Sequence, residues 1–101
     1  MRVHCAVLGI TGLALAALAV PAQAQSVDVS ILAATCAGCH GSNFDGSGPI
    51  PGLRGQQQAY LGNQLQAFKV GARPATVMNR LAKGYTEDEI IALAEHFSKL
   101  K

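Results

Sequence analysis

The run Cys36-Ala37-Gly38-Cys39-His40 constrains this 101-residue chain more than any other feature. Its two thiols are three positions apart and an imidazole directly follows the second, which is the pattern typical of covalent haem attachment. On one helical turn both thiols can reach the two vinyl groups at one porphyrin edge, while His40 turns under the iron. The sequence therefore predicts one covalent haem c, attached through Cys36 and Cys39, with His40 as an axial ligand.

The same cysteine spacing also occurs in thioredoxin-like dithiols and in halves of zinc sites. A thioredoxin-like motif would follow a strand in a βαβ unit, but no stretch of this sequence alternates apolar and polar residues. A zinc site would need further cysteines or a histidine pair downstream. Downstream of Cys39 there is no cysteine, and His96 is the only histidine beyond the motif. The pattern therefore favours haem over both alternatives.

The beginning of the chain has the features of an export signal. A polar start is followed by an apolar stretch from Ala6 to Val20 and then by the small-x-small sequence Ala22-Gln23-Ala24. The apolar stretch is shorter than the roughly 20 residues that cross a bilayer. We therefore expect a signal peptide at residues 1–24, cleaved after Ala24, and one small mature domain at residues 25–101 in the periplasm without membrane attachment.

The mature chain is small and nearly neutral. Removing the first 24 residues from 101 leaves 77, a size at which apolar burial by the polypeptide alone is marginal. A covalent haem would supply both a cross-link and an apolar core. The full chain has eight Lys and Arg and six Asp and Glu. Because Arg2 is removed with the signal peptide, the mature chain has seven basic and six acidic residues and a net charge of +1. This balance gives no indication of nucleic-acid binding.

Apolar periodicity predicts helices and no strands in the mature chain. The first helix, capped by Ser26 or Asp28, should end at the cysteine motif. Seven Gly and Pro residues between positions 41 and 56 predict an irregular loop, of the kind that usually wraps a ligand. A second helix is expected from Gln57 to Lys69, and a third from the capping box that starts at Thr86.

Met78 is the candidate for the second axial ligand of the iron. Electron-transfer haems have two strong axial ligands, and a thioether opposite histidine raises the reduction potential. Met78 is the only methionine after Met1, and it lies in an irregular stretch that begins at Pro74 rather than on an apolar helix face. His96 is the competing ligand, but its place beside the apolar face of the last helix is typical of a packing residue. An open iron site is the remaining alternative.

Pro49 is the candidate for fixing the orientation of His40. An axial histidine normally donates its second ring N–H to a carbonyl, which sets the ring orientation and its basicity. A rigid proline in the loop just after the motif is suited to present such a carbonyl. The alternative is that Pro49 only stiffens the loop.

These features resemble the class I c-type cytochromes across essentially all of residues 27–100. The shared order is Cys-x-x-Cys-His on the first helix, Gly48-Pro49 in the loop, and Met78 ahead of a C-terminal helix. The stretch from Gly52 to Leu65 is similar to the halves of dihaem cytochrome c4. The stretch from Thr76 to Tyr85 is most similar to the cytochrome subunit of flavocytochrome c sulfide dehydrogenase. The resemblance implies an all-α fold of four or five helices, with these site residues: Cys36 and Cys39 as thioethers, His40 and Met78 as axial ligands, and Pro49 as the carbonyl that steadies His40.

The same resemblance implies an electron carrier rather than an enzyme. The likeness around Met78 implies an FAD-containing sulfide dehydrogenase subunit as the redox partner that donates electrons. The alternative is a free shuttle of the cytochrome c4 or c5 kind between a quinol-oxidising complex and a terminal oxidase, and a haem enzyme with an open iron site is the third reading. A basic cluster around Met78 either rims the haem edge and steers an acidic partner or is ordinary solvated surface; its members are Lys69, Arg73, Arg80 and Lys83.

Overall fold

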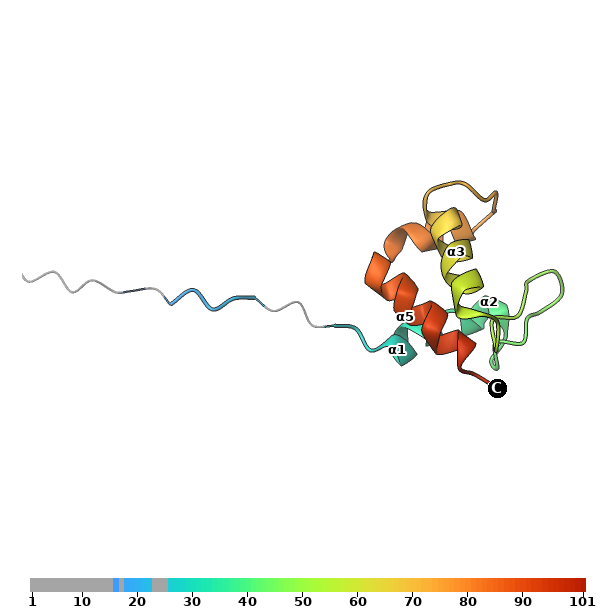
Figure 1. The fold of residues 1–101 in the computed structure, drawn as a ribbon, viewed down its shortest axis with the longest axis horizontal. Coiled ribbons are helices and arrows are strands. Elements are labelled where there is room, and N and C mark those ends of the chain that lie inside the picture. The colour runs from blue at the N-terminus through green and yellow to red at the C-terminus, as the bar shows by residue number, and fades with distance from the viewer. Residues whose placement is uncertain (1–15, 17, 23–25) are drawn as a thin grey trace, which may run out of the picture.

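The computed structural model describes residues 16, 18–22 and 26–101 (Figure 1). Its helices are α1 (Val29–Ala34), α2 (Ala37–His40), α3 (Gln58–Lys69), α4 (Met78–Leu81), the 3-10 turn η1 (Ala82–Gly84) and α5 (Glu87–Ser98). In these described residues the only β-type pairing is an isolated bridge between Ser47 and Ile50, so the prediction of an all-α fold is confirmed. No helix in this part of the chain is long and apolar enough to cross a membrane. The predicted cleavage site and most of the predicted signal peptide lie outside the described residues.

The core forms where α1 and α3 pack against α5 (Figure 1). Leu61 of α3 and Leu93 and Phe97 of α5 are buried in one cluster. Gly62 brings the backbone of α3 close to α5, since a Cβ placed there would lie 3.7 Å from the Cβ of Ala94. These contacts leave the other side of α3 to face the cavity described below.

The predicted first helix is divided into α1 and α2 at Thr35. The Thr35 hydroxyl and backbone N–H both donate to Leu32 O, at 2.7 and 3.3 Å. Because this carbonyl is already used, Cys36 N–H donates to Ala33 O instead, at 3.0 Å, which is the tighter bonding pattern of a helix end. The cysteine motif therefore lies at and within a separate short helix, α2, rather than at the end of α1. The prediction of one continuous helix that runs through Cys36 was therefore wrong.

Asp28, one of the two caps that the sequence offers for the first helix, caps α1. Its carboxylate accepts from the hydroxyl and the backbone N–H of Ser30, both at 2.8 Å. These two bonds lower the pKa of Asp28 below its ordinary value near 3.8. Because the folded-state pKa is depressed, the contribution of this cap is fully present above that ordinary value and is lost as the pH falls through the lowered pKa.

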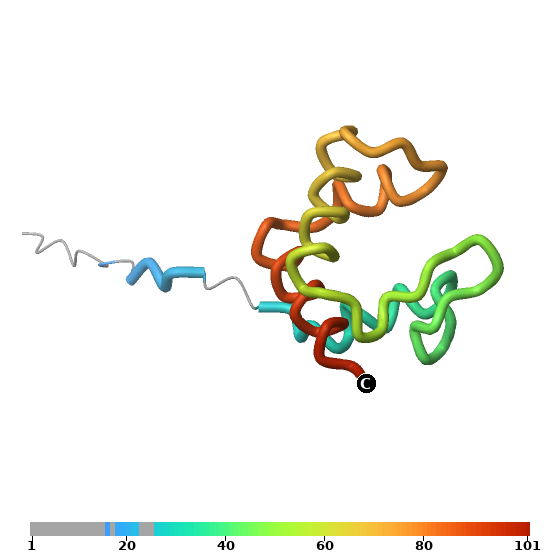
Figure 2. Tube along the Cα trace, turned by 45° about the vertical axis from the view of Figure 1, so that its right-hand side comes forward, coloured from blue at the N-terminus to red at the C-terminus, as the bar shows by residue number. Residues whose placement is uncertain are grey.

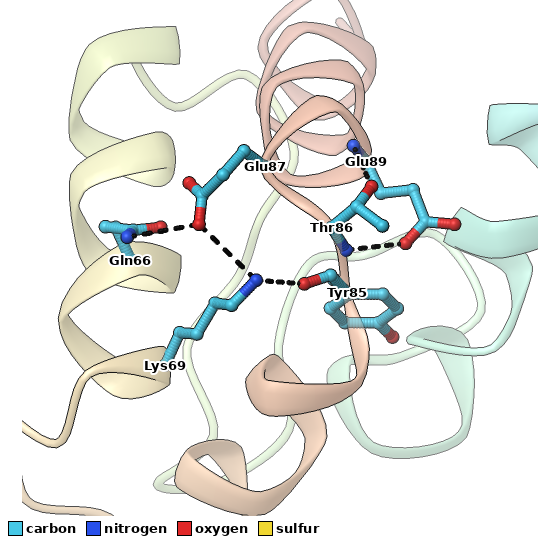
Figure 3. A network of polar contacts seen from close by, with 6 residues as sticks. All are labelled: Gln66, Lys69, Tyr85, Thr86, Glu87 and Glu89. Atoms are coloured by element: carbon cyan, nitrogen blue, oxygen red, sulfur yellow. Dashed lines mark hydrogen bonds and ion pairs between the residues drawn. The ribbon is translucent and has the colours of Figure 1, made fainter.

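Both halves of the capping box predicted at Thr86 are present at the start of α5 (Figure 3). Thr86 Oγ1 accepts from Glu89 N–H at 3.2 Å, and Glu89 Oε2 accepts from Thr86 N–H at 2.8 Å. Beside it, Lys69 Nζ donates to Tyr85 O and lies 3.4 Å from Glu87 Oε1. The end of α3 is thereby tied to the first turn of α5.

Replacing Thr86 by alanine should lower the free energy of unfolding by about 1 kcal/mol, because one backbone N–H at the helix start loses its acceptor. Urea unfolding followed by circular dichroism measures this change. Ser98→Ala is the matched control, because its hydroxyl donates to Glu95 O within the same helix and caps no N-terminus. Equal losses in the two variants would contradict a role for the capping box.

Candidate haem site

A cavity of about 490 Å³ lies between the loop after α2 and the segment that leads into α4. Figure 2 shows that loop and that segment on opposite sides of the molecule's open face, with α3 between them. The volume falls within the roughly 300–1,000 Å³ typical of cofactor pockets. Its walls are mainly apolar, with contributions from Ile50, Leu53, Leu61, Leu65, Phe68, Val77, Leu81, Leu93 and Phe97.

The three side chains of the cysteine motif all line this cavity. Cys36 is half-buried, Cys39 is exposed, and both are free thiols. His40 is buried, with 8% of its surface exposed, and its backbone N–H donates to Cys36 O at 3.0 Å. Burial raises the pKa of the Cys36 thiol, against smaller opposing effects of hydrogen bonds with Thr35 and Tyr85. The short helix α2 and its N-cap residue Cys36 therefore present both thiols and the imidazole to the same space.

The carbonyl that fixes His40 belongs to Pro51, and the prediction of Pro49 was wrong. His40 Nδ1 lies 2.6 Å from Pro51 O. Ser47 and Ile50 exchange two backbone hydrogen bonds of 3.0 Å each, so Gly48 and Pro49 form the tip of a two-residue turn. That turn returns the chain, and Pro51 is the residue that comes back beside the imidazole. Pro49 lines the cavity without holding the ring.

Gly52 lets the returning chain pass close enough to place this carbonyl. A Cβ at Gly52 would lie 2.8 Å from Asp45 O and 3.0 Å from Asp45 C, which are both backbone atoms. On the other side of the contact, Gly46 N–H donates to His40 O at 2.8 Å. The loop is therefore closed on itself around His40, with no room for a side chain at position 52.

Gly52→Ala should displace the Pro51 carbonyl and weaken its hydrogen bond to His40. We expect a lower thermal midpoint and faster solvent exchange of the His40 Nδ1 proton by NMR, because the added methyl group meets backbone rather than a flexible side chain. Gly84→Ala is the control, since a Cβ there meets nothing within 4 Å. An unchanged Nδ1 exchange rate in Gly52→Ala would contradict this account of how the ring is held.

Met78 lines the same cavity from the opposite wall, and His96 does not. Met78 is the first residue of α4 and is half-buried, at the end of the irregular stretch where the sequence places it. The His96 ring instead packs edge to face against Phe97, with ring centroids 5.5 Å apart. The packing role predicted for His96 agrees with this position.

The four residues of the predicted basic cluster have different environments. Lys69 is engaged with Tyr85 O and Glu87. Arg73 lines the cavity and stacks over the Phe68 ring. Arg80 and Lys83 are exposed on α4 and η1. The four residues therefore do not form a uniform positive rim: Lys69 is paired within the protein, Arg73 lies in the cavity wall, and only Arg80 and Lys83 are exposed surface cations without a role in the cavity wall.

The donors around the cavity fit a covalently attached haem. Two thiols and an imidazole face a thioether across a mainly apolar space, and the imidazole has its second nitrogen on a carbonyl, as axial histidines do. Sequence reasoning missed Pro51 and also Tyr85, which lines the cavity and lowers the pKa of the Cys36 thiol against the larger effect of burial. A second proline two residues after Pro49, followed by a glycine, was the available signal for Pro51.

Comparison with known proteins agrees with this geometry. The cytochrome c family model matches residues 29–101. The chain is 47% identical over 70 residues to the cytochrome subunit of sulfide dehydrogenase from Chlorobaculum tepidum, covering 69% of this chain and 64% of that protein. It is 33% identical over 93 residues to cytochrome c-553 of Helicobacter pylori, covering 88% of this chain and 95% of that protein.

Among solved structures, cytochrome c4 of Acidithiobacillus ferrooxidans is similar with a TM-score of 0.62 and 42% identity, over 64% of this chain and 38% of that one. The chain thus spans 64% of the sulfide dehydrogenase subunit and 38% of the cytochrome c4 chain. The class I fold predicted from the sequence, with four or five helices, is confirmed by these relatives and by the five α-helices of the described residues. The chain belongs to the cytochrome c family, whose members carry covalently bound haem c and act as electron carriers rather than as catalysts.

Proposed function

We propose that this chain is an exported electron-transfer protein whose single haem c has His40 and Met78 as axial ligands. The observation that carries the proposal is the convergence of Cys36, Cys39, His40 and Met78 on one cavity from two opposite walls. Bound haem supplies a one-electron ferric and ferrous couple. The chain itself makes and breaks no substrate bond.

Each residue has a separate task in this proposal. Cys36 and Cys39 would form the thioether links to the haem, which would prevent its dissociation. Pro51 O accepts the Nδ1 proton of His40 at 2.6 Å, which leaves Nε2 to face the cavity. Met78 would supply a soft sulfur ligand to the iron, which favours the ferrous state. The apolar wall excludes water and so limits the reorganisation that accompanies a change of charge.

The proposed electron donor is an FAD-containing sulfide dehydrogenase subunit. The support is the identity to a cytochrome subunit of sulfide dehydrogenase, 47% over 70 residues. Co-expression of the chain with such a flavoprotein should give a complex in which sulfide reduces the haem. If no complex forms and sulfide does not reduce the haem, this partner is excluded.

A free electron shuttle is the second candidate, because the chain aligns with 95% of a cytochrome c-553. The two candidates differ in the interface they require. An obligate subunit needs a larger and more apolar contact than a transient redox encounter. Gel filtration of the mixed proteins therefore separates them, with a stable heterodimer supporting the subunit and a monomer that still turns over supporting the shuttle.

Export to the periplasm, with cleavage after Ala24, is part of the proposal. The support is the sequence of the first 24 residues and the haem attachment motif. The intact mass of the protein from the periplasmic fraction should equal residues 25–101 plus one haem. A mass that retains residues 1–24 would contradict cleavage.

Arg80 and Lys83 are the surface cations expected to steer an acidic partner. Replacing both by glutamine should lower the bimolecular electron-transfer rate at low ionic strength by about tenfold, and the difference should vanish at high salt. Lys99→Gln is the control, because Lys99 lies at the far end of α5 and pairs with Glu95 at 2.5 Å. A rate that does not depend on salt would contradict steering.

A further inference from the structure

The loop after α2 folds back on itself at Phe44, whose carbonyl accepts from Leu53 N–H at 2.8 Å and from Arg54 N–H at 3.1 Å. Phe44 has a φ of 59° and is the only non-glycine residue in the described part of the chain with a positive φ. Such a backbone is unfavourable for an aromatic residue and persists only where its surroundings enforce it. Its ring packs against Phe97 of α5, with ring centroids 4.9 Å apart. The loop is therefore held in a strained arrangement by its own returning part and by α5.

Arg54 joins three segments of the chain at this place. Its Nε donates to Asn43 O at 2.9 Å and lies 3.6 Å from Asp45 Oδ1, so it contacts the outgoing part of the loop on both sides of Phe44. Its Nη1 donates to Lys101 O, beyond the end of α5. A guanidinium carries five N–H donors in a fixed plane, which suits acceptors that lie in different directions. One side chain of the returning part thus binds both the outgoing part and the segment that follows α5.

The two parts of the loop hold His40 from different sides. On the outgoing part, Gly46 N–H donates to His40 O at 2.8 Å. On the returning part, Pro51 O lies 2.6 Å from His40 Nδ1, three residues before Arg54. The next residue, Gly55, donates its N–H to a carbonyl of α5 at 2.9 Å. The distance between the ring and its carbonyl therefore depends on how the two parts of the loop are held together, and Arg54 is the side chain that bridges them.

We propose that Arg54 is a positioning residue that keeps the Pro51 carbonyl on His40 and thereby lowers the reduction potential of the protein. This inference rests on the proposed haem attachment. A carbonyl that accepts the Nδ1 proton raises the basicity of an axial imidazole. A more basic ligand favours the ferric state, because ferric iron carries the greater positive charge. Without the bridge, the two parts of the loop separate more easily, the hydrogen bond weakens and the ferrous state gains.

The sign of the potential change tests this role in the holoprotein. Loss of a positive charge alone favours the ferric state, whereas loss of positioning favours the ferrous state. Arg54→Gln should shift the equilibrium about threefold toward ferrous, which is about 28 mV at 59 mV per tenfold change. Arg54→Lys keeps the charge but loses the fork that reaches two acceptors, so it should shift in the same direction. Lys99→Gln is the charge control, since Lys99 pairs with Glu95 within α5, and it should move the equilibrium by less than about twofold, toward ferric.

Solvent exchange of the His40 Nδ1 proton, measured by NMR of the ferrous holoprotein, is the second readout. It should be about tenfold faster in both Arg54 variants, because local opening of the loop exposes the proton. Thr86→Ala is the control for general loss of stability, and its exchange should stay within about twofold of the unmodified protein. A shift toward ferric in Arg54→Gln, or equal exchange in Thr86→Ala and the Arg54 variants, would overturn the proposal.

If Arg54→Gln yields no holoprotein, Arg54→Lys is judged on both readouts by the same criteria. Failure of this proposal is distinguishable from failure of the proposed function. Unmodified protein without covalent haem, or without sulfur ligation of the iron, would show the latter directly.

Discussion

Replacement of Met78 by leucine should remove the sulfur-to-ferric-iron absorption band in the red and lower the reduction potential. The loss follows from removing the only thioether in the cavity wall while keeping an apolar side chain of similar volume. We expect the potential to fall by more than about 60 mV, a tenfold change in the one-electron equilibrium. The free energy of unfolding should change by less than about 1.5 kcal/mol from the volume-conserving swap alone. Absorbance spectroscopy and redox titration measure both properties.

Leu65→Met is the matched control, because Leu65 lines the same cavity from α3. It makes the reverse exchange at a position that is not proposed to ligate, so the band should remain and the potential should move little. An intact red band in Met78→Leu would contradict ligation by Met78. If His96 were the ligand, the unmodified protein would lack this band altogether, and the structure of α5 in the holoprotein would differ from the one described.

Replacement of both Cys36 and Cys39 by alanine should abolish covalent haem and unfold the domain. Among the described residues the buried apolar side chains are few, and three of the seven are alanines, namely Ala33, Ala82 and Ala94. Such a core cannot offset the conformational entropy of a domain of this size. The cofactor is therefore expected to complete the core. Haem staining of a denaturing gel and the helical circular dichroism signal are the measurements.

Cys5→Ala is the control for this experiment, because Cys5 is the third cysteine of the chain and lies within the predicted signal peptide. It should leave haem content and helicity unchanged. Each single variant, Cys36→Ala or Cys39→Ala, should keep one thioether and retain stained haem. Covalent haem in the double variant would contradict attachment through these residues.

Local sequence signals predicted the features that depend on neighbours in the chain. The capping box at Thr86 and Glu89 is such a case, since its two hydrogen bonds join residues three positions apart. The start of α3 after Gln57 and a cap at Asp28 could likewise be predicted from the local sequence. The cysteine motif likewise predicted the cofactor because its three donors lie on one turn.

The sequence did not predict features that depend on competition for a backbone carbonyl or on contacts between residues far apart in the chain. The break between α1 and α2 arises because the Thr35 hydroxyl takes the Leu32 carbonyl, a choice that helix periodicity does not reveal. The carbonyl beside His40 belongs to Pro51 and not to Pro49 because the turn closed by Ser47 and Ile50 brings the chain back at that residue. The roles of Arg73 and Lys69 became distinct only when α3 placed one over Phe68 and the other against Tyr85.

The most direct test of the account is NMR of ferrous holoprotein labelled with ¹³C at the methionine methyl groups. Met78 is the only methionine beyond Met1, so processed protein should give one methyl signal. The account predicts that this signal lies far upfield of ordinary methionine methyls, because an axial methyl group sits directly over the porphyrin ring. A single signal at the ordinary methionine position would contradict ligation by Met78 and with it the proposed electron-carrier site.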